Sequence, residues 1–174
     1  DNVKLRKSVS DFQPDIVFHM AAQPLVREGY KNPLDTWSTN VMGSLNLLNS
    51  LTELKNTCAV VMVTTDKVYK NREWNYGYRE TDILGGYDPY SASKAACELA
   101  ISSWRSSFCS PPNNLLSIAT ARAGNVIGGG DWSKNRLFPD AIRSLISKSS
   151  IPLRNPNFIR PWQYVLDPLR GYIL

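Results

Sequence analysis

Three short apolar segments, residues 15–20, 59–63 and 115–121, alternate with two longer segments that carry helix signals. In residues 33–54 the apolar side chains recur at helical spacing, and residues 89–108 open on a proline, which suits the first turn of a helix. Short, continuous apolar runs are typical of strands that are buried on both faces. The order strand, helix, strand, helix, strand predicts a parallel sheet and therefore an α/β fold.

The carboxyl ends of parallel strands meet at one edge of a sheet, which is where ligands bind in such folds. Small or polar residues follow the three predicted strands, at positions 19–23, 64–67 and 122–125. We expect all three groups to open onto that edge. Ala21 and Ala22 have almost no side chain, so a flat cofactor can approach the backbone there, although a tight exit from the strand would require the same residues.

Tyr90 and Lys94 lie four residues apart in the predicted helix 89–108, and therefore on one face of it. A free phenol loses its proton only near about pH 10, so a tyrosine that acts as a base near neutral pH needs a fixed cation beside it. The pair is typical of proton transfer at a hydroxyl, with the ammonium within reach of a ribose. With eight tyrosines in the chain, this spacing arises by chance too often to assign a function alone.

The composition disfavours several classes of function. His19 is the only histidine, which disfavours a histidine-rich zinc site and a Ser-His-Asp triad, and we expect no metal. Three cysteines without paired spacing favour a reducing compartment, and we expect the cytoplasm. The net charge of +5 is not gathered in a basic run with interleaved aromatic residues, so we expect no nucleic-acid partner. No segment is long and apolar enough to span a membrane, so we expect no membrane partner.

Four further features allow two interpretations each. The long polar loop 67–88 is either a lid or a surface excursion. Asn40, in the middle of a predicted helix, either makes a tertiary hydrogen bond or faces solvent. The glycines at 128–130 lack the pattern of a phosphate loop and predict a turn. Arg160 is suited to bind a diphosphate but is equally an ordinary surface arginine.

Taken together, six motifs follow one another in the order found in nucleotide-sugar 4,6-dehydratases of the extended short-chain dehydrogenase/reductase superfamily, which the chain resembles over nearly its whole length. They are His19 to Ala22, Thr39 and Asn40 with Gly43, Thr65 and Asp66 with Val68 and Tyr69, Tyr90 with Lys94, Arg122 with Asn125, and Arg160 with Trp162, Val165 and Asp167. Epimerases of the superfamily usually have no acid at the position of Asp66. Lys67 replaces the glutamate of most dehydratases, and this departure resembles the subgroup that acts on CDP-glucose.

The resemblance implies a Rossmann-like doubly wound parallel sheet and part of a smaller substrate-binding region. It also implies that the chain begins after the glycine-rich pyrophosphate motif of the family. We therefore expect an internal fragment, lacking the first strands of the sheet and inactive alone, with a partial NAD-binding domain at 1–124 and a partial nucleotide-sugar-binding region at 125–174. The residues implied in NAD binding are Met20, Ala21, Ala22, Gln23, Thr39, Asn40, Tyr90 and Lys94, and those implied in substrate binding are Asn125 and Arg160.

The reaction implied by the resemblance converts CDP-glucose to CDP-4-dehydro-6-deoxyglucose. Tyr90 takes the proton of the 4-hydroxyl while a hydride passes to NAD, and Thr65 shares the hydrogen bond to that oxygen. The ketone acidifies the hydrogen at C5, so water leaves from C6 with Asp66 as the acid, and the hydride then returns to C6. Lys67 stands at the position of the C5 base, for which it must be neutral, or else it stabilises the enolate electrostatically.

Two other functions remain compatible with the sequence. A nucleotide-sugar epimerase or reductase of the same superfamily would not remove water from CDP-glucose, and a non-catalytic nucleotide-binding domain would do no chemistry, because a fold does not guarantee a reaction. Members of the family pair through the helix that contains Tyr90 and the long helix before it. The resemblance therefore implies a homodimer or a higher homo-oligomer.

Overall fold

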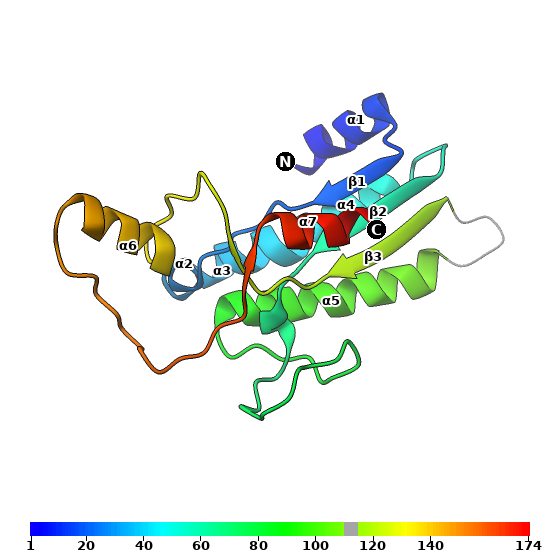
Figure 1. The fold of residues 1–174 in the computed structure, drawn as a ribbon. Coiled ribbons are helices and arrows are strands. Elements are labelled where there is room, and N and C mark those ends of the chain that lie inside the picture. Colours follow the sequence, from blue (N-terminus) through cyan, green and yellow to red (C-terminus); the bar gives the residue numbers. More distant parts are fainter. Residues whose placement is uncertain (110–114) are drawn as a thin grey trace. The chain divides into compact units, whose positions relative to one another are not determined.

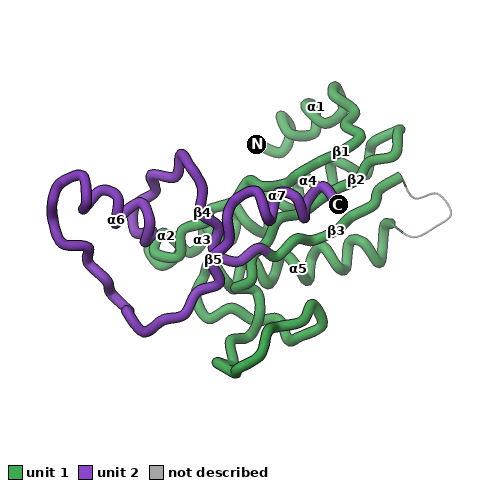
Figure 2. Tube along the Cα trace, viewed as in Figure 1, with its two compact units in different colours: residues 1–122 green, residues 123–174 purple. Residues whose placement is uncertain are grey.

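The computed structural model of the protein describes residues 1–109 and 115–174. These residues form two compact units, unit 1 at Asp1–Arg122 and unit 2 at Ala123–Leu174 (Figure 2). Within the described ranges, no helix has both the length and the apolar character that are needed to span a membrane.

Unit 1 has three strands in the places that the apolar segments predicted, β1 at Ile16–His19, β2 at Cys58–Val63 and β3 at Leu116–Ala121 (Figure 1). The helices that were predicted between them are also present. The first of these is divided into α3 at Pro33–Trp37, a π-helical turn η1 at Ser38–Met42 and α4 at Gly43–Leu51, whereas the second is a single helix, α5, at Pro89–Phe108. Three short elements were not predicted, α1 at Asn2–Phe12, α2 at Val26–Lys31 and a 3-10 turn η2 at Asp66–Val68.

The three strands form one parallel sheet in the order β1-β2-β3. Phe18 of β1 is the partner of Val61 in β2, and Val61 is the partner of Ala119 in β3. Because all three strands point the same way, their carboxyl ends share one edge, as the sequence predicted. The expectation of a parallel α/β sheet is confirmed.

The core of unit 1 lies on one face of this sheet. Side chains from α1, α4, α5 and all three strands form a single apolar cluster there, with Leu48 and Leu51 of α4 fully buried. On the other face, Ile16 remains 61% exposed and Phe18 42% exposed. The expectation that the strands are buried on both faces is therefore wrong for this structure, because the core helices of unit 1 pack against one face only.

Unit 2 contains β4 at Asn125–Ile127, α6 at Leu137–Ile146, β5 at Trp162–Tyr164 and α7 at Leu166–Ile173. The two strands pair in parallel, with Asn125 as the partner of Trp162. The glycines at 128–130 form a turn, and Gly130 has a φ of 83°, a conformation that favours glycine. The next helix starts only at Leu137, so no helix amino terminus follows these glycines directly, in agreement with the sequence analysis.

Candidate active site

The first turn of α5 fixes the position of Tyr90. Asp88 caps the helix by accepting hydrogen bonds from the backbone N–H groups of Tyr90 at 3.0 Å and Ser91 at 3.1 Å, and Ser91 returns a bond to the cap residue. This reciprocal capping box, with Pro89 at the first helical position, defines where the helix begins. The loop before it packs closely, since a Cβ on Gly86 would lie 2.1 Å from the backbone nitrogen of Ala92. Tyr90 is thereby held in a rigid, mostly buried position.

Lys94 lies one turn after Tyr90 and reaches the end of β2. Its Nζ donates to the carbonyl oxygen of Val63, the last residue of that strand, at 3.1 Å. Burial lowers the pKa of the Lys94 ammonium, while the negative charge of Glu98 opposes part of that shift. An ammonium has three donors, so this bond leaves the group able to bind another oxygen. Lys94 is therefore beside the strand end that Thr65 and Asp66 follow, and Tyr90 lies one turn earlier on the same helix.

The turn η2 follows β2 and gathers three of the predicted catalytic residues. Thr65 is buried, and its Oγ1 donates to Oδ1 of Asp66 at 3.1 Å. The same carboxylate oxygen accepts a bond from Nζ of Lys67 at 3.0 Å. About a third of each side chain of this ion pair is exposed, 33% for Lys67 and 29% for Asp66. The structure thus brings an acid and an amine into direct contact at the edge of the sheet.

Asn40 lies inside unit 1 rather than at its surface. The side-chain oxygen accepts from the backbone N–H of Gln23 at 2.8 Å, and the side-chain nitrogen donates to the carbonyl of Gln23 at 3.2 Å and to Oγ of Ser93 at 2.9 Å. Only 1% of Asn40 is exposed. Of the two interpretations of Asn40, the structure supports the tertiary hydrogen bond, because both donors of the amide nitrogen are used inside the protein.

The loop after β1 presents its backbone at the surface. Met20 is 52% exposed and Ala21 is exposed, whereas Ala22 and Gln23 are partly buried. Thr39, in the π-helical turn η1, is exposed as well. Turns of this type occur often at functional sites. Small residues and accessible backbone therefore occur together here, as a flat cofactor requires.

His19, at the end of β1, points into the protein. Its Nε2 lies 3.1 Å from Oγ of Ser44 in α4. Burial, with a further contribution from the charge of Lys94, lowers the pKa of His19 to about 4. His19 is therefore neutral near pH 7. Among the described residues, no cluster of three or more histidine, cysteine or acidic side chains is arranged to hold a metal ion.

Arg122 makes an ion pair that the sequence analysis did not identify. Its guanidinium binds both carboxylate oxygens of Glu98, through Nε at 3.0 Å and Nη2 at 2.8 Å. Glu98 lies on α5 one turn after Lys94 and is 4% exposed. The sequence could have identified Glu98 but not its partner. A glutamate four residues after Lys94 lies on the same helical face, and a buried charge requires a partner.

The loop between η2 and α5 is folded onto itself. Tyr69 and Leu84 form an isolated antiparallel bridge near its two ends. Inside the loop, Tyr78 stacks on Tyr69 with ring centroids 5.0 Å apart and lies 5.2 Å from Trp74. The lid remains a prediction, since this ordered aromatic packing does not by itself distinguish a lid from a surface excursion.

The two predicted substrate-binding residues lie close together within unit 2. The backbone N–H of Asn125 donates to the carbonyl of Pro161 at 2.9 Å, and Arg160 directly precedes that proline. Arg160 is exposed, and its guanidinium carbon lies 5.2 Å from the ring centroid of Phe158. An exposed guanidinium beside a strand start is accessible to an anion.

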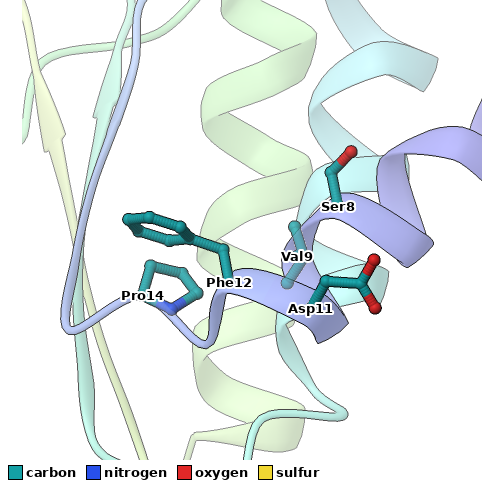
Figure 3. A pocket seen from close by; sticks show the side chains of 5 residues that line it. All are labelled: Ser8, Val9, Asp11, Phe12 and Pro14. Atoms are coloured by element: carbon teal, nitrogen blue, oxygen red, sulfur yellow. The ribbon is translucent and has the colours of Figure 1, made fainter.

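A surface hollow elsewhere in unit 1 is lined by Ser8, Val9, Asp11, Phe12 and Pro14 (Figure 3). Pro14 comes just before β1, so the hollow lies at the amino-terminal edge of the sheet, opposite the edge with Thr65 and Lys94. Its one ionisable group, Asp11, is paired with Lys7 at 2.8 Å. It does not belong to the candidate site.

Unit 1 contains the side chains that acid and base chemistry on a hydroxyl-bearing ligand requires. A tyrosine and an ammonium come from α5, and a hydroxyl, a carboxylate and a second amine come from η2. The residues that would approach a flat cofactor follow β1, on the same edge. Proton transfer at a hydroxyl and at a neighbouring carbon is therefore chemically possible at this edge.

Comparison with known proteins agrees with this geometry. A family model described as GDP-mannose 4,6 dehydratase matches residues 1–174. The CDP-glucose 4,6-dehydratase of Salmonella typhimurium is 55% identical over the whole of this chain and 49% of that relative. The UDP-glucose 4-epimerase of Mycoplasma genitalium is 26% identical over the whole of this chain and 54% of its own length.

Solved structures show the same fold. The dTDP-glucose 4,6-dehydratase from Streptomyces venezuelae, in a structure with NAD bound, superposes with a TM-score of 0.85 at 25% identity, over 98% of this chain and 50% of that one. The chain spans about half the length of the relatives it matches. The Rossmann-like α/β fold and the resemblance to nucleotide-sugar dehydratases are confirmed, and the chain belongs to the GDP-mannose 4,6 dehydratase family.

Proposed function

We propose that this chain carries the catalytic residues of an NAD-dependent enzyme that dehydrates CDP-glucose to CDP-4-dehydro-6-deoxyglucose. The proposal rests on one observation, that Lys94 of α5 and the residues of η2 lie at the same carboxyl end of β2. Lys94 reaches the carbonyl of Val63, and Thr65, Asp66 and Lys67 follow that residue directly. The 55% identity to a CDP-glucose 4,6-dehydratase supports the same substrate.

The residues after β1 fit the nicotinamide end of NAD. Small side chains at Ala21 and Ala22 allow a close approach to the backbone, Met20 and Thr39 are exposed, and the Lys94 ammonium has donors for a ribose hydroxyl. NAD, when bound, supplies the acceptor and donor of hydride. Gln23 and Asn40 support the loop through mutual hydrogen bonds, which makes Asn40 a residue that positions the cofactor loop.

Tyr90 acts on the 4-hydroxyl of the sugar. It takes the hydroxyl proton during oxidation at C4, and Lys94, one turn away on the same face of α5, stabilises the phenolate electrostatically. The side chain of Thr65 shares the hydrogen bond to the sugar oxygen. Both residues are held by secondary structure, Tyr90 by the capped start of α5 and Thr65 by η2.

Asp66 and Lys67 remove water from the oxidised sugar as a unit. Their ion pair holds one proton on the amine, and transfer of that proton to the carboxylate gives a neutral amine and a carboxylic acid together. The amine then takes the C5 proton while the acid protonates the departing C6 hydroxyl, which restores the original ion pair. Every proton is accounted for within the pair and the sugar.

The nucleotide diphosphate is held by unit 2. Asn125 and Arg160 are brought together by the pairing of β4 with β5, and an arginine can meet phosphate oxygens with two parallel bonds. In this scheme residues 1–124 form the part that binds NAD and residues 125–174 the part that binds the nucleotide sugar. Each is part of a larger site in a protein of the length of its relatives.

A homodimer formed through the helices of unit 1 is also part of the proposal. Exposed apolar side chains occur on these elements, at Leu34 and Trp37 of α3, Met42 of η1 and Leu99 of α5, and a contact between two copies would bury them. The three cysteines, Cys58, Cys97 and Cys109, are free, which supports a reducing compartment such as the cytoplasm.

The function is tested with the complete natural protein that carries this chain. CDP-glucose, dTDP-glucose and GDP-mannose are incubated with it in parallel, and the 4-keto-6-deoxy products are measured. We expect product from CDP-glucose at a rate at least about tenfold above the other two. Inversion at C4 without loss of water would instead indicate an epimerase, and NAD binding without any turnover would indicate a non-catalytic domain.

A further inference from the structure

A junction around Arg122, which follows β3, joins helix α5, the loop 69–88 and the end of β2. The guanidinium binds Glu98 of α5 through two nitrogens, at 3.0 and 2.8 Å, and its Nη1 donates to Oη of Tyr69 and to the carbonyl of Glu80, each at 3.0 Å. Oε1 of Glu98 also accepts a hydrogen bond from Thr64, the residue after β2. The planar guanidinium of an arginine has five N–H donors that can bind several partners at once, whereas a lysine has three donors on a single nitrogen.

The pair at the centre of this junction is shielded from water. The side chain of Glu98 is 4% exposed and that of Arg122 16% exposed. Hydrogen bonds from Arg122 and Thr64 lower the pKa of the Glu98 carboxyl against the opposing effect of burial, so Glu98 is charged. A buried charge without its partner is strongly unfavourable, and Glu98 and Arg122 therefore keep each other in place.

The junction holds the loop 69–88 at two points, its first residue and a residue near its middle. Tyr69 is held by its hydroxyl and by the guanidinium carbon of Arg122, which lies 5.0 Å from the ring centroid. Glu80 is held through its backbone carbonyl. Tyr78 stacks on Tyr69, so the aromatic side chains inside the loop are also connected to Arg122, through Tyr69. In the described part of unit 1, this anchor joins the loop to α5 and to the end of β3.

We propose that Glu98 and Arg122 are positioning residues, which hold the loop 69–88 and the turn 65–67 in a fixed relation to Tyr90 and Lys94. The functional consequence rests on the proposed dehydration. Neither residue is placed at the reacting atoms. Each acts through a neighbour, because Thr64 precedes the catalytic turn directly and Glu98 follows Lys94 by one helical turn.

The two stages of the reaction depend differently on this junction. Of the groups that serve oxidation at C4, Tyr90 and Lys94 share helix α5, and only Thr65 lies at the start of η2. Asp66 and Lys67, which serve loss of water, lie on another segment that the junction ties to that helix. A displacement of about 1 Å between catalytic groups can cost about 100-fold in rate. Loosening the junction should therefore slow the loss of water more than the oxidation.

The test uses Arg122→Lys in the complete natural protein, with Arg105→Lys as the matched control. Arg105 also joins α5 to β3, by a bond from Nη1 to the carbonyl of Ile118 at 3.3 Å, but within residues 1–109 and 115–174 it makes no hydrogen bond to the loop. The first readout needs neither cofactor nor substrate. Limited trypsin digestion well below the unfolding temperature, with the first cuts mapped by mass spectrometry, reports the opening of the loop at Arg72 and Arg79.

We expect Arg122→Lys to be cut in the loop at least about tenfold faster than the control, since local opening becomes easier. The second readout is turnover. We expect kcat to fall about 10- to 100-fold, with KM for CDP-glucose within about threefold of the unmodified value. After quenching, borodeuteride labels C4 of all oxidised sugar, and a larger fraction of this sugar should retain its C6 hydroxyl.

Tyr69→Phe is a milder second variant. It removes one bond between Arg122 and the loop and leaves the Glu98 pair intact, so it keeps the test decisive if Arg122→Lys fails to fold. Faster cutting of the loop in Tyr69→Phe than in Arg105→Lys supports the anchor. Loop cutting or kcat that matches the control in both variants overturns it. If the unmodified protein does not convert CDP-glucose, the proposed function fails, and the proteolysis comparison alone decides whether the pair anchors the loop.

Discussion

Nζ of Lys67 lies 3.0 Å from Oδ1 of Asp66, and the same oxygen accepts a bond from Thr65. The contact places an amine and a carboxylate, one proton between them, directly after the strand that Lys94 reaches. Dehydration needs one group that accepts a proton from carbon and one that donates a proton to oxygen. The proposed function assigns these two capacities to the amine of Lys67 and the carboxylate of Asp66.

Replacement of Lys67 tests whether it is the base. In Lys67→Ala, exchange of the C5 hydrogen with solvent deuterium should fall by about 100-fold or more, because general base catalysis contributes at least that much. Folding stability should change by less than about 1 kcal/mol, since the pair is partly exposed. Lys70→Ala, at an exposed position of the same loop, is the control. Undiminished C5 exchange in Lys67→Ala would exclude Lys67 as the base.

A double variant tests whether Asp66 and Lys67 act as a unit. Asp66→Asn and Lys67→Ala should each reduce formation of the dehydrated product strongly. Combined, they should cost about as much as the more severe single change, because groups that share one proton are not independent. Product formation is measured for all four proteins under identical conditions. A double variant whose loss equals the product of the two single losses would contradict the shared proton.

Asn40 should affect stability and cofactor binding together. Asn40→Ala leaves the backbone of Gln23 and the hydroxyl of Ser93 without their partner, which should cost about 2 to 3 kcal/mol of unfolding free energy. The loosened loop should also bind NAD more weakly. Asn49→Ala, an exposed position on α4, is the control. Weaker NAD binding with unchanged stability would instead identify Asn40 as a direct cofactor contact.

The lowered pKa of His19 predicts how the folding stability depends on pH. Its pKa is lowered from 6.5 to about 4 in the folded protein, so between these values the unfolded chain binds a proton that the folded chain does not. The contribution of His19 to folding stability is therefore fully present above about pH 6.5 and is lost as the pH decreases to about 4, by about 3 kcal/mol. His19→Gln, which keeps a polar group near Ser44, should flatten this decline. An unchanged decline between pH 6.5 and 5 in the variant would show that another group is responsible.

Local sequence signals were sufficient for the main elements of unit 1. The helix predicted at 89–108 has the same bounds in the structure, because Asp88, Pro89 and Ser91 form a complete start signal. The helix α1 was missed because it buries only Val9 and is otherwise largely polar. The π-helical turn was not predicted either, and it contains Asn40, whose bond to Ser93 joins residues 53 positions apart.

The candidate site was predictable where its residues are neighbours in the sequence. The Thr65 to Lys67 turn and the pair of Tyr90 with Lys94 are each local, and the fold needed only to bring a strand end to a helix. The partnership of Glu98 with Arg122 was not predictable in this way. It joins residues 24 positions apart, and whether their side chains meet depends on how α5 is placed along β3.

The central claim, a dehydration that begins by oxidation at C4, is tested most directly by the fate of one hydrogen. The complete natural protein is given CDP-glucose with deuterium at C4, and the position of the label in the product is determined by nuclear magnetic resonance. We expect the deuterium to move to C6 of CDP-4-dehydro-6-deoxyglucose. Deuterium that returns to C4, or a product that keeps its C6 hydroxyl, would contradict it.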